Sequence, residues 1–245
     1  MRRALRVPLE GLAPGSRELS GEIARYILRV HRLRVGDRLF CFDPVQGLEA
    51  EAEISSTSAD RLECLLYEVR ASGYRSLPVC LLQGLAKGSK PEAILAEATA
   101  LGTARIVFME TEHAVVRLPD ARGVARRERW QRIAAQAARQ SGRGNLPSIE
   151  GPISFGQALQ VAAERRLLLT PGGSPLLGEL SGWHSGQTVA LLVGPEGGFS
   201  PSESEQARAH GYVEAALGRT TLRTELAAVA ALGAIVAFAE LSKIG

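Results

Sequence analysis

A continuous apolar run that passes into a glycine-rich loop and then into a helix start constrains the fold of this chain more than any other feature. Val189–Val193 is apolar at every position, and Gly194–Ser200 follows it with three glycines. Ser200–Glu203 has the pattern of a helix N-terminus, with a capping Ser, a Pro at the first helical position and a Glu at the third. A buried strand followed by a loop and a helix is the repeating unit of an α/β sheet, whose ligands bind beyond the carboxyl ends of the strands.

Apolar runs and helical patterns alternate in the same way along the chain after residue 76. We predict strands over Leu77–Leu82, Arg105–Met109, Leu167–Leu169, Val189–Val193 and Tyr212–Leu217. We predict helices that begin near Pro91, span Arg126–Gln140, run from Ser200 to His210, and begin again at Thr224. Strands that alternate with helices indicate an α/β domain with a largely parallel sheet.

The first seventy residues follow a different pattern, in which short strands are separated by turn residues. We predict strands over Arg34–Phe42, Leu48–Ile54 and Arg61–Val69, with a short helix over Ser20–Val30. The stretch Arg70–Arg75 is the best candidate for a linker. We therefore divide the chain into a small β-rich domain over residues 1–72 and an α/β domain over residues 73–245.

Cysteine, histidine and hydropathy patterns exclude several classes of protein. The three cysteines and four histidines are widely spaced, so we expect neither a disulfide framework nor a metal site. The longest apolar stretch, Leu226–Phe238, is too short and too rich in alanine to span a bilayer, and no apolar signal segment follows Arg2 and Arg3. With 45% hydrophobic residues the chain can bury a core, and we expect a soluble cytoplasmic protein without membrane association.

Arginine is concentrated in two segments. Eight arginines against two acidic residues lie between Arg117 and Arg143, and five against Asp37 lie between Arg25 and Arg38. The formal net charge is only +3, so bulk charge does not identify a nucleic-acid-binding protein. Because guanidinium groups bind phosphate bidentately and stack on bases, these segments indicate either RNA contact or two solvated faces.

Three loops that leave predicted strands contain residues suited to a ligand. Glycines in Gly194–Ser200 let backbone groups approach a ligand closely, but Pro195 and Glu196 would disfavour a pyrophosphate. Leu217–Glu225 brings charged side chains to a strand end, and Thr170–Gly173 is a third loop of this kind. The loops together predict a pocket for a neutral or cationic ligand, against the alternative of tight turns that bind nothing.

Two of these loops carry a recognisable pattern. Gly194–Ser200, with Leu217–Arg219 and Leu222–Glu225, resembles the signature of the bacterial 16S ribosomal RNA uracil-N3 methyltransferases, which belong to the knotted SPOUT superfamily. The resemblance covers nearly the whole chain. It continues in Met1–Arg3, in Arg32–Asp37, in Lys87-Gly88 with Leu101-Gly102, and in Gln140–Arg143 with Pro147.

The resemblance implies a fold, a cofactor and partners. The fold is a SPOUT-type trefoil-knotted α/β methyltransferase domain preceded by a small PUA-like β-barrel that binds RNA. The expected cofactor is S-adenosyl-L-methionine, and the expected substrate is 16S ribosomal RNA in the decoding region of the 30S ribosomal subunit. A homodimer is expected to complete the active site. The residues implied for cofactor binding are Thr170, Pro171, Gly194, Pro195, Glu196, Gly197, Gly198, Leu217, Gly218, Leu222 and Thr224.

The resemblance and the chemistry of uracil together nominate catalytic and RNA-binding residues. The uracil N3–H must lose its proton, and Arg223 is our first choice to stabilise the resulting anion, with Arg143 from the same or the partner subunit second. Glu225 is either a base or a helix-start carboxylate paired with Arg219 or Arg223. The residues expected to contact RNA are Arg2, Arg3, Arg25, Arg32, Arg34, Lys87, Arg126, Arg139 and Arg143.

Some positions depart from the family pattern, and alternatives stay open. Arg139 and Ala100 stand where Glu is usual, Ser89-Lys90 replaces Asp-Arg, and His113-Ala114 replaces Arg-Ser. These changes lie outside the cofactor loops, so they bear on RNA contacts and on the target nucleotide. One alternative is a SPOUT methyltransferase that acts on another position of ribosomal or transfer RNA, and another is an RNA-binding homologue without turnover. A nicotinamide-dependent dehydrogenase is disfavoured because the dinucleotide fingerprint is absent.

Overall fold

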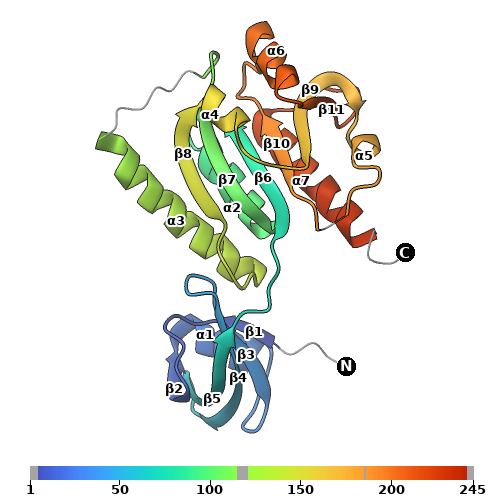
Figure 1. Cartoon of the computed structure of the whole chain (residues 1–245). Helices are drawn as coiled ribbons and strands as arrows, with labels where there is room; N and C mark the ends of the chain where they lie inside the picture. Colours follow the sequence, from blue (N-terminus) through green and yellow to red (C-terminus); the bar gives the residue numbers. More distant parts are fainter. Residues whose placement is uncertain (1–4, 115–120, 185, 242–245) are drawn as a thin grey trace. The chain divides into compact units, whose positions relative to one another are not determined.

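The computed structural model describes residues 5–114, 121–184 and 186–241. One compact unit comprises the chain up to Tyr74 together with Ala138–Leu146, and the other comprises Arg75–Ala137 and the chain from Pro147 onward (Figure 1). The predicted division at residue 72 assigns Ala138–Leu146 to the second domain, whereas the structure groups this segment with the first unit. The reason is close packing, since a Cβ atom on Gly144 would lie 2.9 Å from Cβ of Tyr74.

The smaller unit is a five-stranded mixed sheet with the strand order β1-β3-β4-β5-β2. Its strands are β1 (Leu5–Pro8), β2 (Gly15–Ser20), β3 (Arg38–Asp43), β4 (Leu48–Thr57) and β5 (Arg61–Ala71). The three predicted strands are confirmed as β3, β4 and β5, which pair in antiparallel register. The predicted helix over Ser20–Val30 is a short α-helix, α1 (Gly21–Arg25), followed by a π-helical turn over Tyr26–Val30.

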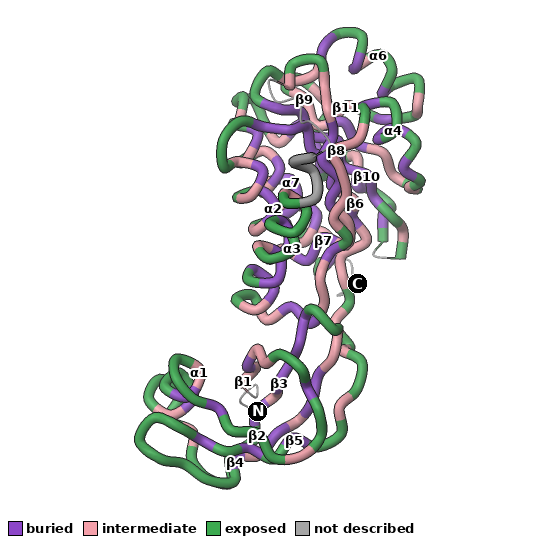
Figure 2. Tube along the Cα trace, turned by 90° about the vertical axis from the view of Figure 1, so that its left-hand side faces the viewer, coloured by how far each residue is buried: buried purple, intermediate pink, exposed green. Residues whose placement is uncertain are grey.

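The larger unit contains a six-stranded parallel sheet with the order β11-β9-β10-β6-β7-β8. Its strands are β6 (Leu77–Gly84), β7 (Thr103–Glu110), β8 (Ser148–Ser154), β9 (Arg165–Pro175), β10 (Val189–Val193) and β11 (Val213–Ala216). The predicted parallel α/β sheet is therefore confirmed, with β8 added to it. Buried residues concentrate along these central strands in Figure 2.

Helices cover both faces of this sheet. They are α2 (Lys90–Ala100), α3 (Ala121–Ser141), α4 (Phe155–Leu159), α5 (Leu176–Glu179), α6 (Pro201–Ala209) and α7 (Thr224–Leu241). Successive residues of a strand point to opposite faces, so Leu191 packs in one core with α2 and α7, and Leu192 packs in another with α4 and α6. Both faces of β10 are thus buried, which explains its uninterrupted apolar sequence.

The carboxyl ends of β9, β10 and β11 lie at one edge of the sheet, and close backbone packing joins two of them. β9 pairs with β11 through Leu167 and Leu168 and again through Ser174 and Pro175, with an irregularity between the two stretches. A Cβ atom on Gly173 would lie 2.8 Å from the backbone nitrogen of Ala215. Only glycine therefore allows these two strands to approach as they do.

We predict that Gly173→Ala destabilises the larger unit, because a methyl group cannot fit against the backbone of β11. Overpacking of this kind costs about 1–3 kcal/mol, which should lower the melting temperature by several degrees in differential scanning calorimetry. Gly156→Ala is the matched control, since Gly156 lies in α4 with nothing within 4 Å of an added Cβ, and it should be neutral or stabilising. Equal melting temperatures for Gly173→Ala and the unchanged chain would contradict the packing argument.

Candidate functional site

A cavity of about 560 Å³ lies at the carboxyl ends of β9, β10 and β11. This volume is in the range of small-molecule sites, roughly 300–1,000 Å³. Two of the loops that we predict, Gly194–Ser200 and Leu217–Glu225, form its walls, whereas the predicted loop Thr170–Gly173 lies within β9 and contributes Thr170 and Pro171 from that strand. All eleven predicted cofactor residues line the cavity, with Arg223 beside them. Lys90, the first residue of α2, also lines the cavity and is not among those predictions.

The loop after β10 is held by steric fit and by the helix cap that follows it. Gly198 has a φ of +67°, a backbone conformation that favours glycine. The predicted capping box is confirmed, because Ser200 Oγ accepts from the Glu203 amide while the Glu203 carboxylate accepts from the Ser200 amide. The other oxygen of Glu203 accepts from the amide of Glu112 at 2.8 Å, which connects the loop to the segment after β7.

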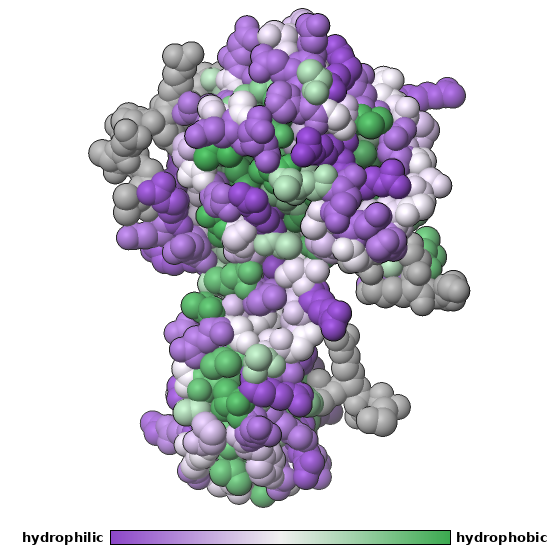
Figure 3. Space-filling view, in the orientation of Figure 1, coloured by the Kyte–Doolittle hydropathy of each residue, from purple (hydrophilic) through white to green (hydrophobic). Residues whose placement is uncertain are grey.

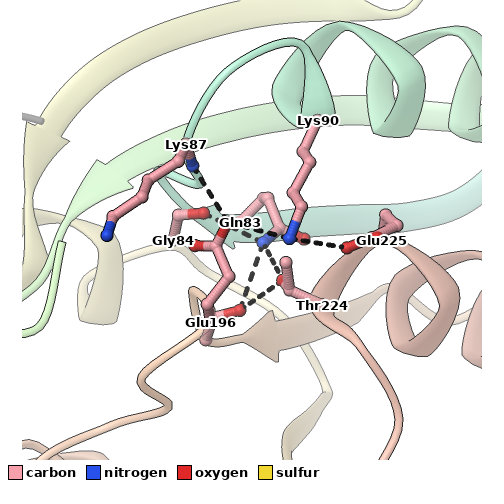
Figure 4. A network of polar contacts seen from close by, with 8 residues as sticks. Gln83, Gly84, Lys87, Lys90, Glu196, Thr224 and Glu225 are labelled. Atoms are coloured by element: carbon pink, nitrogen blue, oxygen red, sulfur yellow. Dashed lines mark hydrogen bonds and ion pairs between the residues drawn. The ribbon is translucent and has the colours of Figure 1, made fainter. Parts of the chain in front are cut away.

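A buried hydrogen-bond network ties this loop to β6 and α7 (Figure 4). The carbonyl oxygen of Gly194 accepts from the Thr224 hydroxyl at 2.5 Å and from the Gln83 side-chain amide at 3.3 Å. The same amide of Gln83 donates to Thr224 Oγ1 at 3.0 Å. Thr224 is the first residue of α7, so its hydroxyl fixes the helix start against the glycine loop.

Charged groups from three segments meet at the edge of the cavity. Glu196 Oε1 accepts from the backbone amide of Lys87 at 3.1 Å and lies 3.0 Å from Lys90 Nζ. Lys90 Nζ also lies 3.5 Å from Glu225 Oε2 (Figure 4). Partial burial by itself would raise the pKa of Glu196, but backbone hydrogen bonds and the Lys90 ammonium outweigh it, so this pKa lies below its usual value. The hydrogen bond to Glu196 raises the pKa of Lys90.

His113 contacts the glycine loop from the segment after β7. Its Nδ1 lies 3.0 Å from the carbonyl oxygen of Gly197, so this nitrogen carries the proton and donates. A Cβ atom on Gly197 would lie 2.8 Å from Cβ of His113, so the glycine is required for this contact. The departure from the family pattern at His113 is therefore next to a predicted cofactor loop and not remote from it.

The three predicted catalytic residues have different surroundings. Arg223 is exposed at the cavity, and no ion pair to it is found within the described residues. Glu225 faces Lys90, so the predicted pairing with Arg219 or Arg223 is wrong. Arg143 belongs to the smaller unit, where it is only 1% exposed, its Nε donates to Asn145 and its guanidinium lies over the Tyr74 ring. Burial lowers the pKa of Arg143 to about 10.

The predicted RNA-binding residues are spread over both units. Arg32, Arg34 and Lys87 are exposed, and exposed Arg25 lies 3.9 Å from Asp60. Arg126 lies over the Trp130 ring, and Arg139 forms an ion pair with Glu10. Arg2 and Arg3 lie outside the described residues.

Two findings bear on the expected absence of a metal and of membrane association. Within residues 5–114, 121–184 and 186–241, no group of three or more His, Cys, Asp or Glu side chains is arranged to hold a metal ion. Helix α7 is long and apolar enough to cross a membrane by length and composition alone, with a mean hydropathy of 1.8. Its Ala228, Leu232 and Ile235 nevertheless pack into the core of the larger unit.

Two family models match the chain. An RNA methyltransferase domain matches residues 74–236, and an RNA methyltransferase PUA domain matches residues 19–67. The parallel sheet with its loop cavity, preceded by the small β-unit, therefore defines an RNA methyltransferase with a PUA domain.

Several similar proteins belong to one kind of RNA methyltransferase. The ribosomal RNA small subunit methyltransferase E of Bacillus subtilis (strain 168) is 34% identical over 227 residues, which cover 89% of this chain and 88% of that protein. The protein of the same name from Synechocystis is 34% identical over 220 residues, 88% of this chain and 71% of the relative. A crystal structure of such an enzyme from Neisseria gonorrhoeae, bound to S-adenosyl methionine, aligns with a TM-score of 0.71 at 29% identity, over 95% of this chain and 97% of the other.

The chain belongs to the ribosomal RNA small subunit methyltransferase E family. The predicted family is therefore confirmed, as is the predicted fold class of an α/β methyltransferase domain preceded by a PUA-like domain.

We predict that Thr224→Val loosens the glycine loop, because valine keeps the shape of the side chain but removes the hydroxyl that bonds Gly194 and Gln83. Removing these two buried hydrogen bonds should cost about 1–3 kcal/mol in the free energy of unfolding, measured by urea titration. Thr103→Val is the matched control, since Thr103 is fully buried and its hydroxyl has no hydrogen-bond partner in the described part of the chain. An equal loss in both variants would show that the network contributes nothing specific.

Proposed function

We propose that this chain transfers a methyl group from S-adenosyl-L-methionine to N3 of a uridine in 16S ribosomal RNA of the 30S ribosomal subunit. The observation that carries the proposal is the cavity, whose walls contain every residue that the family resemblance nominates for the cofactor. The relatives named above are small-subunit ribosomal RNA methyltransferases, and one of them holds S-adenosyl methionine.

The residues of the cavity fit this cofactor. Its walls are mostly backbone and apolar side chains from two loops and from β9, which suit recognition of an adenosine through main-chain groups. Glu196 supplies a negatively charged carboxylate, which suits a cationic ligand, and its pKa lies below the usual value. When bound, S-adenosyl-L-methionine supplies an electrophilic methyl group on a sulfonium. Thr170, Gly194, Gly197, Gly198, Leu217 and Leu222 are among the residues that would hold it.

The chain's own contribution to the reaction is to position the uracil and to stabilise the negative charge that forms on it. Arg223 is exposed at the cavity, so its guanidinium is available to stabilise the uracil anion that forms when N3 loses its proton. Glu225 is a weak candidate for the group that accepts the N3 proton, because its carboxylate already faces Lys90. Arg143 would have to leave its buried position over Tyr74 to reach a substrate, so we rank it below Arg223.

In this proposal one domain binds RNA and the other transfers the methyl group. Residues 1–72 form the RNA-binding PUA-like domain and residues 73–245 the methyltransferase domain. Arg32, Arg34 and Lys87 are exposed, so they are available to contact phosphate. Since ribosomal RNA is the substrate, we place the protein in the cytoplasm.

We predict that the purified chain methylates 16S ribosomal RNA at a uridine N3, and that Arg223→Ala lowers the turnover number by roughly 10²–10³-fold while cofactor binding stays measurable. Small subunits, free ribosomal RNA and transfer RNA should each be offered with cofactor, and the modified nucleoside identified by mass spectrometry. Arg208→Ala is the control, since Arg208 pairs with Glu214 away from the cavity and its loss should leave turnover unchanged.

Different results would contradict different parts of the proposal. Methylation of transfer RNA, or of another position in ribosomal RNA, would indicate a related methyltransferase with another target. Cofactor binding without turnover on any RNA would indicate a non-catalytic RNA-binding protein. Unchanged turnover in Arg223→Ala would remove Arg223 from the catalytic residues.

A homodimer completes the proposal, and α7 offers the surface for it. Hydrophobic residues reach the surface of the larger unit among hydrophilic ones (Figure 3), and only 33% of α7 is buried. Its outward side carries Leu226, Ala230, Gly233 and Ala237, spaced along one helical face, and Leu226 is 53% exposed. The same helix begins at the cavity through Thr224 and Ala227, so a second copy on this face would lie beside the site.

We predict that the chain sediments at twice its monomer mass in analytical ultracentrifugation, and that Leu226→Glu with Ala237→Glu shifts it to the monomer. Burying two charges against a second apolar face would cost several kcal/mol, enough to separate the subunits. Val45→Glu is the control, because Val45 is 56% exposed in a turn of the smaller unit. A monomer in the unchanged chain, or a dimer that survives both substitutions, would rule out this interface.

A further inference from the structure

We propose that Lys90 is a positioning residue that holds the glycine loop in its cofactor-binding conformation by bridging Glu196 and Glu225. This inference rests on the proposed function, since it concerns the same cavity. It adds a residue that the family resemblance does not nominate and assigns that residue a role toward the loop.

The geometry places one cation between two carboxylates from different segments. Lys90 Nζ lies 3.0 Å from Glu196 Oε1, in the loop after β10, and 3.5 Å from Glu225 Oε2, in the first turn of α7 (Figure 4). Both oxygens are thus within 3.5 Å of one nitrogen, and removal of the ammonium would leave two like charges close together. Of the two carboxylates, Glu196 lies in the glycine-rich loop and Glu225 lies in the first turn of α7, so repulsion would displace the loop before the helix.

The use of lysine at this position is itself informative. Only three of the 29 basic residues are lysines, and two of them lie close together, Lys87 in the loop between β6 and α2 and Lys90 at the first position of α2. A lysine ammonium is a compact point charge that can face two separate carboxylates, whereas the planar guanidinium of arginine favours one carboxylate in a bidentate pair. The bridge therefore uses the side chain whose shape suits it.

The exposure of the Lys90 and Glu196 side chains indicates that their ion pair positions the loop and contributes little to folding. The side chains of Lys90 and Glu196 are 33% and 32% exposed, and ion pairs at this level of exposure contribute little to global stability. The main effect of the bridge is therefore local, because it fixes the positions of Glu196 and the neighbouring glycines. Loss of Lys90 should weaken cofactor binding while the melting temperature changes by no more than about 2 °C.

The first test uses the cofactor-free protein. The Glu196 carboxyl should be titrated by NMR with carbon-13-labelled glutamate in the full chain. In Lys90→Met the pKa of Glu196 should rise, because the cation that favours the charged carboxylate is gone. Lys87→Met is the matched control, since Lys87 contacts Glu196 through its backbone amide and its own side chain is exposed, so the pKa of Glu196 should stay where it is.

The second test is a double-mutant cycle on cofactor affinity, measured by calorimetry with S-adenosyl-L-methionine and no RNA. Lys90→Met should raise the dissociation constant by on the order of tenfold, and Lys87→Met should leave cofactor affinity unchanged. Lys90→Arg, which keeps the charge but not the compact shape, should recover only part of the loss. If Lys90 acts through Glu196, Lys90→Met should have little further effect in a Glu196→Gln background.

The outcomes separate this inference from the proposed function. If the pKa of Glu196 does not shift in Lys90→Met, the proposed bridge is ruled out, whether or not the cofactor binds. Additive effects of Lys90→Met and Glu196→Gln on affinity overturn the positioning role, because Lys90 would then act on the ligand directly. Failure of the unchanged chain to bind S-adenosyl-L-methionine counts against the proposed function, and the titration still decides the place of Lys90.

Discussion

The carbonyl oxygen of Gly194 lies at the end of the central strand β10 and accepts hydrogen bonds from Thr224 and Gln83. Gln83 precedes Gly194 by 111 residues and Thr224 by 141, so three distant parts of the chain meet at one buried acceptor. A polar group buried without a partner costs about 1–3 kcal/mol, so these groups stay together. The end of β6, the path of the glycine loop and the start of α7 are fixed by the same network, and the cavity walls depend on all three.

The strong strands and helices of this fold could be predicted because burial leaves a clear pattern. Val189–Val193 is buried on both faces and is therefore apolar throughout, and Ser200–Glu203 forms the capping box that its sequence predicts. The missed elements lack such a pattern. β8 is Ser-Ile-Glu-Gly-Pro-Ile-Ser, with no fully buried residue, and β2 has one buried residue in six. Edge strands and short helices owe their structure to neighbours that are distant in sequence.

Some residues of the site could likewise be predicted from the sequence, and others could not. Residues on the loops after β10 and β11 could be predicted because each loop directly follows a strand of a parallel sheet, where ligands bind. The sequence places Thr170 and Pro171 in such a loop, but they lie within β9. Lys90 and Gln83 could not, because their place depends on β6 lying next to β10. His113 could not, because its place also depends on β7 lying next to β6, and no periodicity specifies this strand order. Arg143 shows the limit of charge patterns. Its arginine-rich surroundings favour phosphate contact, whereas the structure buries it over Tyr74.

The strand order also governs how the chain can reach its fold. β10 lies between β6 and β9, although β6 ends at Gly84 and β10 begins only at Val189. Before β10 inserts, β6 and β9 each present an unpaired backbone edge, and both cores lack their central residues. Closing a loop of this length must lose chain entropy before any contact compensates for it. The larger unit therefore completes its sheet only after most of the chain has been synthesised, and until then its early strands are the segments most prone to aggregation.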